Sequence, residues 1–268
     1  MAATQHKKGE RFRALHENGP FVIPNPWDAG SAKVLAGLGF EALATTSSGF
    51  AFTLGRHDSG VTLDEVVDHT RVLVDAVELP ISVDLENGYG AQPEQAAAAI
   101  ERAAEAGAVG GSIEDYDPDD DRLYDLGHAL ERVTAAVEAA RALDFPFTLT
   151  ARAENHIRCN PDLDDTVARL QAFERAGADV LYAPGLRTTG EIRAVCDATA
   201  KPVNVLARPK LPLADIFEAG AQRVSLGGSL AFLAVSAMAA AAESIRDDGD
   251  FTKIALGPKL GDWLAALD

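Results

Sequence analysis

Cysteine and histidine are scarce in this sequence of 268 residues, and their scarcity argues against several classes of protein. There are two cysteines, Cys159 and Cys196, and no CxxC pair. Two cysteines are too few for a disulfide framework, so the expected compartment is a reduced cytoplasm. The six histidines form no HxxxH or HxH motif, which argues against a zinc site.

Basic residues are also few, because 24 Lys and Arg face 41 Asp and Glu and leave a net charge of −17. This charge repels phosphate backbones and anionic lipid surfaces, so neither nucleic acid nor a membrane is an expected partner. An anionic substrate would need local cations or a metal in order to bind.

Long apolar segments are missing as well. The longest, SLAFLAVSAMAAAA at 229–242, is shorter than the roughly 20 residues of a membrane span, and we interpret it as a buried helix. The first 19 residues are charged and lack the apolar centre of a signal peptide, which agrees with the cytoplasmic expectation.

What the sequence does contain is one recurring joint. An alanine-rich, helix-like segment stops at a glycine and a short apolar strand follows at once, around Gly39, Gly107, Gly177 and Gly220. Glycine is favoured just past a helix end because it accepts a left-handed backbone at little cost. A helix followed directly by a strand, repeated, is typical of a parallel sheet.

The whole chain divides into eight such units. Helical patterns such as 64–77 and 93–107 separate eight predicted strands, at 20–24, 41–45, 80–84, 109–114, 146–151, 179–183, 202–206 and 222–226. Eight alternating units in about 250 residues predict a (β/α)8 TIM barrel. A doubly wound open sheet is the alternative, but no GxGxxG follows the first strand. We predict one domain over 1–268, with a helical C-terminal extension at about 240–268.

A barrel brings the carboxyl ends of its strands to one mouth, where catalytic groups lie. Polar residues lie at or just after the ends of six predicted strands, the first five and the seventh. They are Asn25, Asp28, Thr45, Thr46, Ser47, Ser48, Asp84, Glu86, Glu114, Asp115, Arg152, Glu154 and Asn204. The sequence therefore predicts a cluster of acids, one arginine and a hydroxyl-rich turn.

The stretch PISVDLENGYG carries two of these acids out of an apolar strand. Asp84 and Glu86 are two residues apart and share a face while the strand lasts, and Glu114 ends the neighbouring strand. Three crowded carboxylates raise one another's pKa values, and a hard cation such as Mg²⁺ removes that conflict. Any one of these acids alone would be interpreted as a solvated charge in a loop. The three together, at successive strand ends, favour a metal site.

Two further motifs have alternative interpretations. Arg152, in FTLTARAEN, is expected to form a buried salt bridge with one of the acids, to bind a substrate anion through two parallel hydrogen bonds, or to do both. The turn ATTSSGFAFTLG suits ordinary turn chemistry, or a grip on a carboxylate or phosphate by backbone N–H groups and hydroxyls.

Taken together, NPWDAGSAKVLAGLGFEALATTSSGFAFTLGRHDSG, SVDLENGYG, GSIEDY and TARAE resemble the isocitrate lyase / phosphoenolpyruvate mutase superfamily over about residues 22–233. The resemblance implies a Mg²⁺-dependent barrel, with Mn²⁺ as a possible substitute, that binds a 2-oxo acid or its enolate and breaks or makes an adjacent C–C or P–C bond. By motif, Asp84 is implied as the direct metal ligand, while Asp58, Glu86 and Glu114 hold the waters of the metal. The resemblance also implies that Thr46, Ser47 and Ser48 grip the substrate carboxylate, that Arg152 faces the enolate oxygen, and that Asn204 is a polar contact.

The sequence also departs from this pattern. After the fourth-strand acid the lyases carry a Lys-Arg/Lys-Cys-Gly loop and the mutase carries Lys-x-Asn, whereas 116–127 here contains no lysine, cysteine or asparagine. Pro184 stands where the mutase has a histidine. Isocitrate or methylisocitrate cleavage and phosphonate rearrangement are therefore disfavoured.

We thus expect a cytoplasmic Mg²⁺-dependent lyase acting on a small 2-oxo (di)carboxylate, of the oxaloacetate-decarboxylase type, with Arg152 and Glu114 as catalytic residues. The proton donor is left open among a metal-bound water, Tyr182 and His156. A C–C or P–C hydrolase and a non-catalytic 2-oxo-acid-binding barrel are the rival functions. The resemblance also implies a homo-oligomer, a dimer of dimers in which the last barrel helix is exchanged.

Overall fold

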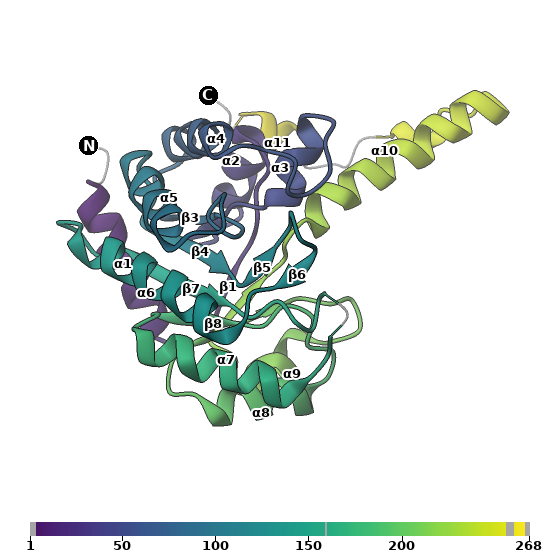
Figure 1. Cartoon of the computed structure of the whole chain (residues 1–268). Helices are drawn as coiled ribbons and strands as arrows, with labels where there is room; N and C mark the ends of the chain where they lie inside the picture. The colour runs from purple at the N-terminus through teal and green to yellow at the C-terminus, as the bar shows by residue number, and fades with distance from the viewer. Residues whose placement is uncertain (1–3, 159, 256–259, 266–268) are drawn as a thin grey trace.

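The structure is a computed structural model that describes residues 4–158, 160–255 and 260–265. Eight parallel strands form one sheet in the order β1-β10-β9-β8-β7-β4-β3-β2. A hydrogen bond from Ala44 N to Pro24 O (3.1 Å) joins the ends of this sheet, so that it forms a nearly closed barrel (Figure 1). The barrel strands are β1 (Phe21–Ile23), β2 (Leu43–Ala44), β3 (Ile81–Asp84), β4 (Gly110–Glu114), β7 (Thr148–Arg152), β8 (Val180–Tyr182), β9 (Val203–Leu206) and β10 (Arg223–Ser225).

All eight predicted strands are confirmed, and the fold is the predicted (β/α)8 barrel. Helices separate the strands: α1 (Gln5–Glu17), α2 (Ala29–Gly37), α3 (Ser47–Thr53), α4 (Leu63–Ala76), α5 (Pro93–Glu105), α6 (Leu126–Ala142), α7 (Leu163–Ala176), α8 (Thr189–Ala198), α9 (Leu213–Glu218), α10 (Ser229–Asp248), the 3₁₀ turn η1 (Thr252–Ile254) and α11 (Leu260–Ala265). A short antiparallel pair, β5 (Tyr116–Asp117) and β6 (Arg122–Leu123), lies in the loop after β4 and was not predicted.

Local chemistry accounts for the ends of these helices. Thr62 and Glu65 form a reciprocal capping box that starts α4, and Pro93 occupies the first turn of α5. The recurring glycine joint is confirmed, because Gly39, Gly107, Gly177 and Gly220 all have a left-handed backbone, with φ between +89° and +107°.

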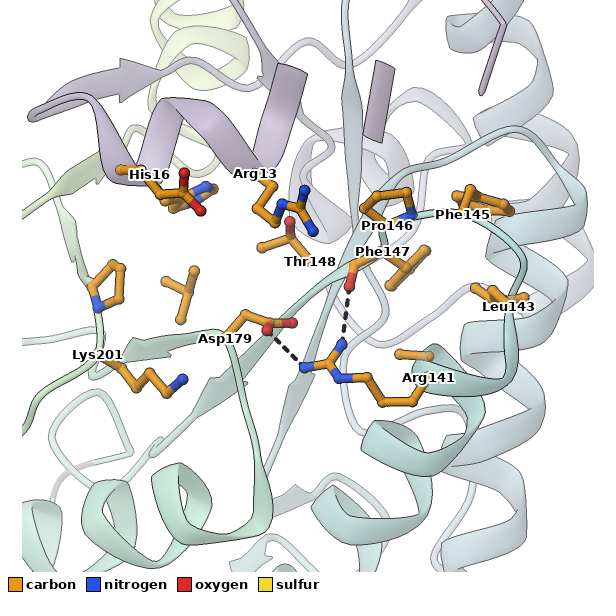
Figure 2. A pocket seen from close by; sticks show the side chains of 14 residues that line it. Arg13, His16, Arg141, Leu143, Phe145, Pro146, Phe147, Thr148, Asp179 and Lys201 are labelled. Carbon is orange, nitrogen blue, oxygen red and sulfur yellow. Dashed lines mark hydrogen bonds and ion pairs between the residues drawn. The ribbon is translucent and has the colours of Figure 1, made fainter. Parts of the chain in front are cut away.

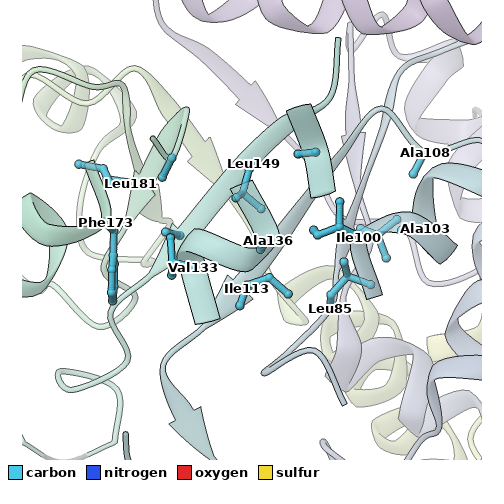
Figure 3. Close-up of a cluster of buried hydrophobic side chains, with 14 of the residues drawn as sticks. Leu85, Ile100, Ala103, Ala108, Ile113, Val133, Ala136, Leu149, Phe173 and Leu181 are labelled. Carbon is cyan, nitrogen blue, oxygen red and sulfur yellow. The ribbon is translucent and has the colours of Figure 1, made fainter. Parts of the chain in front are cut away.

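The core lies between the strands and the ring of helices. Side chains that point outward from the strands, such as Ile113, Leu149 and Leu181, meet helix side chains such as Ile100 and Phe173, and all are buried (Figure 3). Alternate residues of the same strands, including Thr150 and Arg152, point into the barrel, because successive strand side chains face opposite ways. The sequence of one strand thus serves both the core and the site.

Helix α1 covers the amino-terminal end of the barrel. Phe12 is fully buried against Ile23, Ala42 and Val109. Gly9 of α1 packs against the segment that precedes β7. A Cβ added at Gly9 would be 2.3 Å from Pro146 O, so this close approach requires a glycine. The barrel is therefore open at its other end.

The prediction of a buried helix at 229–242 is wrong. Helix α10 extends away from the barrel (Figure 1), and Leu233 and Met238 are each 65% exposed. Only Ala231, Ala241 and Ser244 are buried along its length. Its length and composition also suffice for a membrane span, a test that single helices of non-membrane proteins pass as well. Among the described residues its apolar side has few neighbours: the Phe52 ring lies edge-on to that of Phe232, with centres 5.9 Å apart, and η1 contacts the helix.

Candidate active site

A cavity of about 210 Å³ opens at the carboxyl ends of the barrel strands. It is lined by side chains from most of the strands, among them Asp84, Ser112, Tyr182 and Ser225, and by Asp58 and Pro184 from the loops. Every residue predicted to bind substrate lies on this wall: Thr46, Ser47, Ser48, Asp84, Arg152 and Asn204. The structure therefore brings together side chains that are up to 158 positions apart, counting from Thr46 to Asn204 (204 − 46).

A row of five polar residues crosses the barrel from β4 to β10. The sheet register pairs Glu114 with Arg152, Arg152 with Tyr182, Tyr182 with Asn204, and Asn204 with Arg223. Residues in register on parallel strands point to the same face, and here that face is the barrel interior. We call these five residues the polar row.

Arg152 is the centre of the charged part of the site. Its guanidinium contacts Asp84 (Nη1 to Oδ1, 2.8 Å), Glu114 (Nη2 to Oε2, 2.9 Å) and Glu154 (Nη2 to Oε1, 2.8 Å). It also lies 5.3 Å from the centre of the Tyr182 ring. Burial alone would lower its pKa, but the carboxylates of Glu154, Glu114 and Asp84 outweigh burial, so the pKa of Arg152 stays well above its ordinary value. The salt-bridge interpretation of Arg152 is confirmed, and its position on the cavity wall keeps the substrate-binding interpretation open.

Asp84 is held by groups that leave part of its carboxylate available. Oδ1 accepts from Arg152 Nη1 (2.8 Å) and, at longer range, from Glu86 N (3.3 Å) and Ser112 Oγ (3.4 Å). Oδ2 accepts one long bond, from Ser47 N (3.4 Å). Backbone and arginine together therefore orient the carboxylate toward the cavity.

Glu86 does not continue the strand, because β3 ends at Asp84 and Glu86 has a left-handed backbone with φ +48°. That conformation is uncommon for a residue with a side chain, and it is fixed by a hydrogen bond from Glu114 N to Glu86 O (2.9 Å). Gly88 follows with φ +82°, where an added Cβ would be 2.8 Å from Ala96 Cα. The glycine-rich turn after the acids thus turns the chain sharply and buries Glu86.

The acids repel one another as the sequence predicted. Burial first, and then the Asp84 and Asp58 carboxylates, raise the pKa of Glu86 to about 7. Burial and the neighbouring Glu154 carboxylate raise the pKa of Glu114 well above its usual range. Crowded, buried acids with raised pKa values are an arrangement that a nearby cation would relieve.

The four predicted metal residues are not equivalent in position. Asp84 and Asp58 line the cavity, Glu86 faces an adjacent hollow together with Ser59 and Tyr89, and Glu114 lies behind Arg152. In residues 4–158, 160–255 and 260–265, no three Asp, Glu, His or Cys side chains gather closely enough to ligate one ion. The donor set fits an ion such as Mg²⁺, which takes few protein carboxylates and keeps several waters. Asp84 would be its direct ligand.

The hydroxyl turn (Thr46, Ser47 and Ser48) joins β2 to α3. Thr46 Oγ1 accepts from Gly49 N (3.3 Å), which is ordinary helix capping, and it lies 3.2 Å from Ser48 Oγ. The turn-chemistry interpretation is therefore confirmed. The hydroxyl of Ser48 and the N–H of Ser47 lie on the cavity wall, so the same turn is also placed to contact an anion.

Comparison with known proteins identifies the family. Residues 12–246 match the family model described as phosphoenolpyruvate phosphomutase. The chain belongs to the isocitrate lyase / phosphoenolpyruvate mutase superfamily. A solved structure of a putative lyase/mutase from Burkholderia cenocepacia J2315 is 51% identical, with a TM-score of 0.93, over 97% of this chain and 96% of that one.

Two relatives of known activity are more distant. The oxaloacetate decarboxylase of Rhodopseudomonas palustris (strain HaA2) is 30% identical over 80% of this chain and 75% of its own length. The 2-methylisocitrate lyase of Escherichia coli (strain K12) is 30% identical over 81% and 72%. The superfamily is thereby shown, whereas the two relatives perform different reactions.

The sequence placed Glu154 at the barrel mouth without assigning it a role, and it did not single out Arg158. Glu154 bonds to Arg152, two residues before it in TARAE, and that spacing was a usable signal. Arg158 lies 3.7 Å from the centre of the Tyr116 ring and contacts Glu114 (3.4 Å) and Glu154 (3.3 Å). Glu154 is four residues away in the same loop, whereas Glu114 ends β4 and Tyr116 begins β5, so the local sequence indicates the first contact only.

The two side chains considered as proton donors are placed differently. Tyr182 lines the cavity, and burial raises its pKa to about 12. His156 is buried but is not on the cavity wall, and its Nε2 has no hydrogen-bond partner among the described residues. Of these two, Tyr182 is the one that a bound substrate could touch. Cys159 lies outside the described residues.

A second cavity, of about 430 Å³, lies at the opposite end of the barrel (Figure 2). Arg13, His16 and Lys201 line it, and Arg141 there bonds to Asp179 (2.6 Å) and to Phe147 O (3.4 Å). It contains none of the predicted site residues. The amino-terminal ends of barrel strands serve stability rather than catalysis in this fold.

Proposed function

We propose that the protein is a Mg²⁺-dependent lyase that cleaves the C–C bond beside the 2-oxo group of a small (di)carboxylate, with oxaloacetate as the first substrate to test. The observation that carries this proposal is the cavity wall itself, where Arg152, Asp84 and the hydroxyl turn face one space of about 210 Å³. That space suits a ligand of a few carbon atoms. The relationship to an oxaloacetate decarboxylase supports the reaction class.

In the proposed reaction the hydroxyl turn binds the C1 carboxylate of the substrate. Arg152 faces the oxygen that gains negative charge as the bond breaks, and a fixed donor at that point stabilises the transition state more than the substrate. The three carboxylates around Arg152 hold its guanidinium in place, so little reorganisation is needed during the reaction.

Asp84 would hold the metal, and Asp58, Glu86 and Glu114 would hold its waters. When bound, Mg²⁺ would polarise the substrate carbonyl and carboxylate as a Lewis acid. Burial and then the Asp84 carboxylate raise the pKa of Glu86 to about 7, and a nearby cation would lower it by favouring the charged form. Tyr182, whose phenol lines the cavity, would donate the proton.

The loop after β4 supports decarboxylation over methylisocitrate cleavage. Residues 116–127 form the β5–β6 pair and contain no cysteine or lysine that could serve as an acid. Pro184, which cannot transfer a proton, lines the cavity after β8. A reaction that needs only an enolate-stabilising arginine, carboxylates that could hold a metal and a hydroxyl donor matches the residues that line the cavity.

The test is an NMR-monitored panel of 2-oxo acids, including oxaloacetate and phosphonopyruvate, with and without Mg²⁺. Decarboxylation yields pyruvate and CO₂ from oxaloacetate, whereas a C–C hydrolase yields oxalate and acetate, and a P–C hydrolase yields pyruvate and phosphate. The Asp84→Asn variant should be inactive, and Asp68→Asn, a surface substitution at an exposed Asp68–Arg71 pair, should be active. Binding of oxalate without turnover of any 2-oxo acid would instead favour a non-catalytic barrel.

We also propose that two chains associate through α10, in keeping with an exchanged helix. Leu233, Met238 and Phe232 are exposed along it. The following segment returns to the barrel, since Trp263 of α11 lies near Gly37 of α2. A helix that leaves the barrel while its successor returns presents an apolar surface that a second chain can cover.

A further inference from the structure

Arg223 is a buried cation without an acidic partner in the described part of the chain. It is 5% exposed, and burial lowers the pKa of its guanidinium to about 10. Its three hydrogen-bond partners are neutral: Asn204 Oδ1 (2.9 Å), Thr150 Oγ1 (2.9 Å) and His16 Nε2 (3.2 Å). An unpaired buried charge is expensive to maintain, and Arg223 also lines the floor of the proposed active site.

The contact with Arg223 determines the orientation of Asn204. Arginine has donors only, so the amide must present Oδ1 to Arg223 Nε, and its NH₂ group must then face the other way. Asn204 Nδ2 accordingly donates to Ser225 Oγ (2.9 Å). If the Asn204 amide were reversed, its NH₂ group would face the N–H groups of Arg223, and neither could accept a hydrogen bond.

The hydrogen-bond chain continues to the cavity. Because Ser225 Oγ accepts from Asn204, its own hydrogen is free to donate. Tyr182 is in register with Asn204 and lines the same cavity as Ser225, and donation from Ser225 to its phenol oxygen opposes the rise in the Tyr182 pKa. The Tyr182 hydrogen is then directed away from Ser225, and Tyr182 lines the cavity. We call Arg223, Asn204, Ser225 and Tyr182 the interior relay; every donor in it points toward the substrate space.

The far side of Arg223 is fixed as well. His16, on α1 and labelled in Figure 2, bonds through Nδ1 to Phe12 O (2.9 Å), so Nδ1 carries the hydrogen and Nε2 is free to accept from Arg223. Burial and then the Arg223 charge lower the pKa of His16 to about 3, which keeps the ring neutral. The Arg223 guanidinium is therefore bound on one side by His16 of α1, and on the other side it donates to Asn204.

We infer that Arg223 is a positioning residue for the proposed reaction: through Asn204 and Ser225 it directs the Tyr182 hydroxyl at the enolate oxygen or carbon of the substrate. This inference rests on the proposed function for its chemistry, but the relay itself is a property of the ligand-free protein. A purely structural role makes a different prediction. Replacing a buried charge by an apolar side chain of similar volume is often neutral or stabilising, so stability and function should separate.

The experiment compares Arg223→Met, Ser225→Ala and the double variant with Thr150→Val, a matched control that removes another Arg223 contact but leaves the Asn204 bond. Tyrosine labelled with ¹³C at Cζ gives few signals, because the chain has four tyrosines, and Tyr182→Phe identifies the relevant one. Thermal unfolding, the affinity for oxalate in Mg²⁺ by calorimetry, and kcat on oxaloacetate are measured on the same samples.

We expect Arg223→Met to unfold at the wild-type temperature or above, to shift the Tyr182 signal, and to weaken oxalate binding and kcat by about tenfold each. Ser225→Ala should do the same, and the double variant should be no worse than either single one, because both break one relay. Thr150→Val should leave the Tyr182 signal in place. If Arg223→Met does not fold, the same readings are taken on Arg223→Lys, which keeps a cation but not the planar fork.

An unmoved Tyr182 signal in the Arg223 variant, or losses that add in the double variant, would overturn the relay. If the wild-type protein binds no oxalate with Mg²⁺ and turns over no 2-oxo acid, the proposed function fails. In that case the Tyr182 signal of the Arg223 variant still shows whether the interior relay exists. Failure of the proposed function and failure of the relay can therefore be told apart.

Discussion

Replacing Arg152 by lysine tests the catalytic assignment most directly, because lysine retains the charge and loses the planar fork. The guanidinium reaches three carboxylates at once, Asp84 at 2.8 Å, Glu114 at 2.9 Å and Glu154 at 2.8 Å. A single ammonium nitrogen cannot span all three. At least one charge-assisted hydrogen bond is therefore lost, which removes about 1.5–3 kcal/mol from the free energy of unfolding.

For a chain of this size that loss lowers the unfolding temperature by about 5 °C. The effect on turnover should be larger. If Arg152 stabilises the enolate oxygen, its contact strengthens as charge develops there, and kcat should fall by about 10²–10³. The KM should rise much less, because the positive charge still attracts the anionic substrate.

The assay is steady-state turnover of oxaloacetate per folded site, together with thermal unfolding and Mg²⁺ titration. Arg141→Lys is the matched control, since Arg141 also pairs with an aspartate (Asp179, 2.6 Å) but lies at the opposite end of the barrel and is 46% exposed. It should lose under about 1 kcal/mol and no activity. A drop in unfolding temperature and Mg²⁺ affinity with kcat within about threefold of wild type would refute the catalytic role and leave Arg152 a structural partner of the acids.

Three other predictions follow from the structure. Asp84→Ala should abolish Mg²⁺-dependent oxalate binding while the barrel stays folded, because Arg152 retains Glu114 and Glu154; an unchanged affinity by calorimetry would remove Asp84 from the metal site. The protein should self-associate at micromolar concentration in light scattering, and Leu233→Glu on α10 should produce a monomer, whereas a monomeric wild type would contradict the shared-helix proposal. Acidification should destabilise the fold through His16, whose pKa falls from 6.5 to about 3 on folding. The folded state binds fewer protons there, so stability present above pH 6.5 is lost as the pH falls, by about 2 kcal/mol at pH 5, and His16→Gln should flatten that slope in denaturant titrations.

The fold was predictable because its signals are local. Each strand is a short β-forming run that ends beside polar residues, and four of the helix–strand joints contain a glycine with positive φ, as Gly107 and Gly177 do. The same locality placed Asp84, Arg152 and Asn204 at the mouth, since the barrel topology alone brings strand ends together. The resemblance to a known superfamily then supplied their expected roles, which the structure leaves as proposals.

Other features depend on contacts between distant parts of the chain. The expected pairing of Asp84 with Glu86 on one strand face failed, because β3 ends at Asp84 and the turn is fixed by a bond from β4. Arg158 joins the acids from the loop after β7; Glu154 is its neighbour in that loop, but Glu114 lies 44 positions away on β4.

The alternation of buried and inward-facing residues can be inferred from the sequence, because it follows from the two-residue period of a strand. Which inward-facing residues meet depends on how the strands assemble into the barrel. Register places Arg223 beside Asn204, and α1 brings His16 to the same guanidinium from 207 positions away. Likewise, composition made 229–242 apolar, but whether an apolar helix is covered depends on what packs against it. Hydrophobicity along a chain is a local property, whereas burial is a property of the assembled molecule.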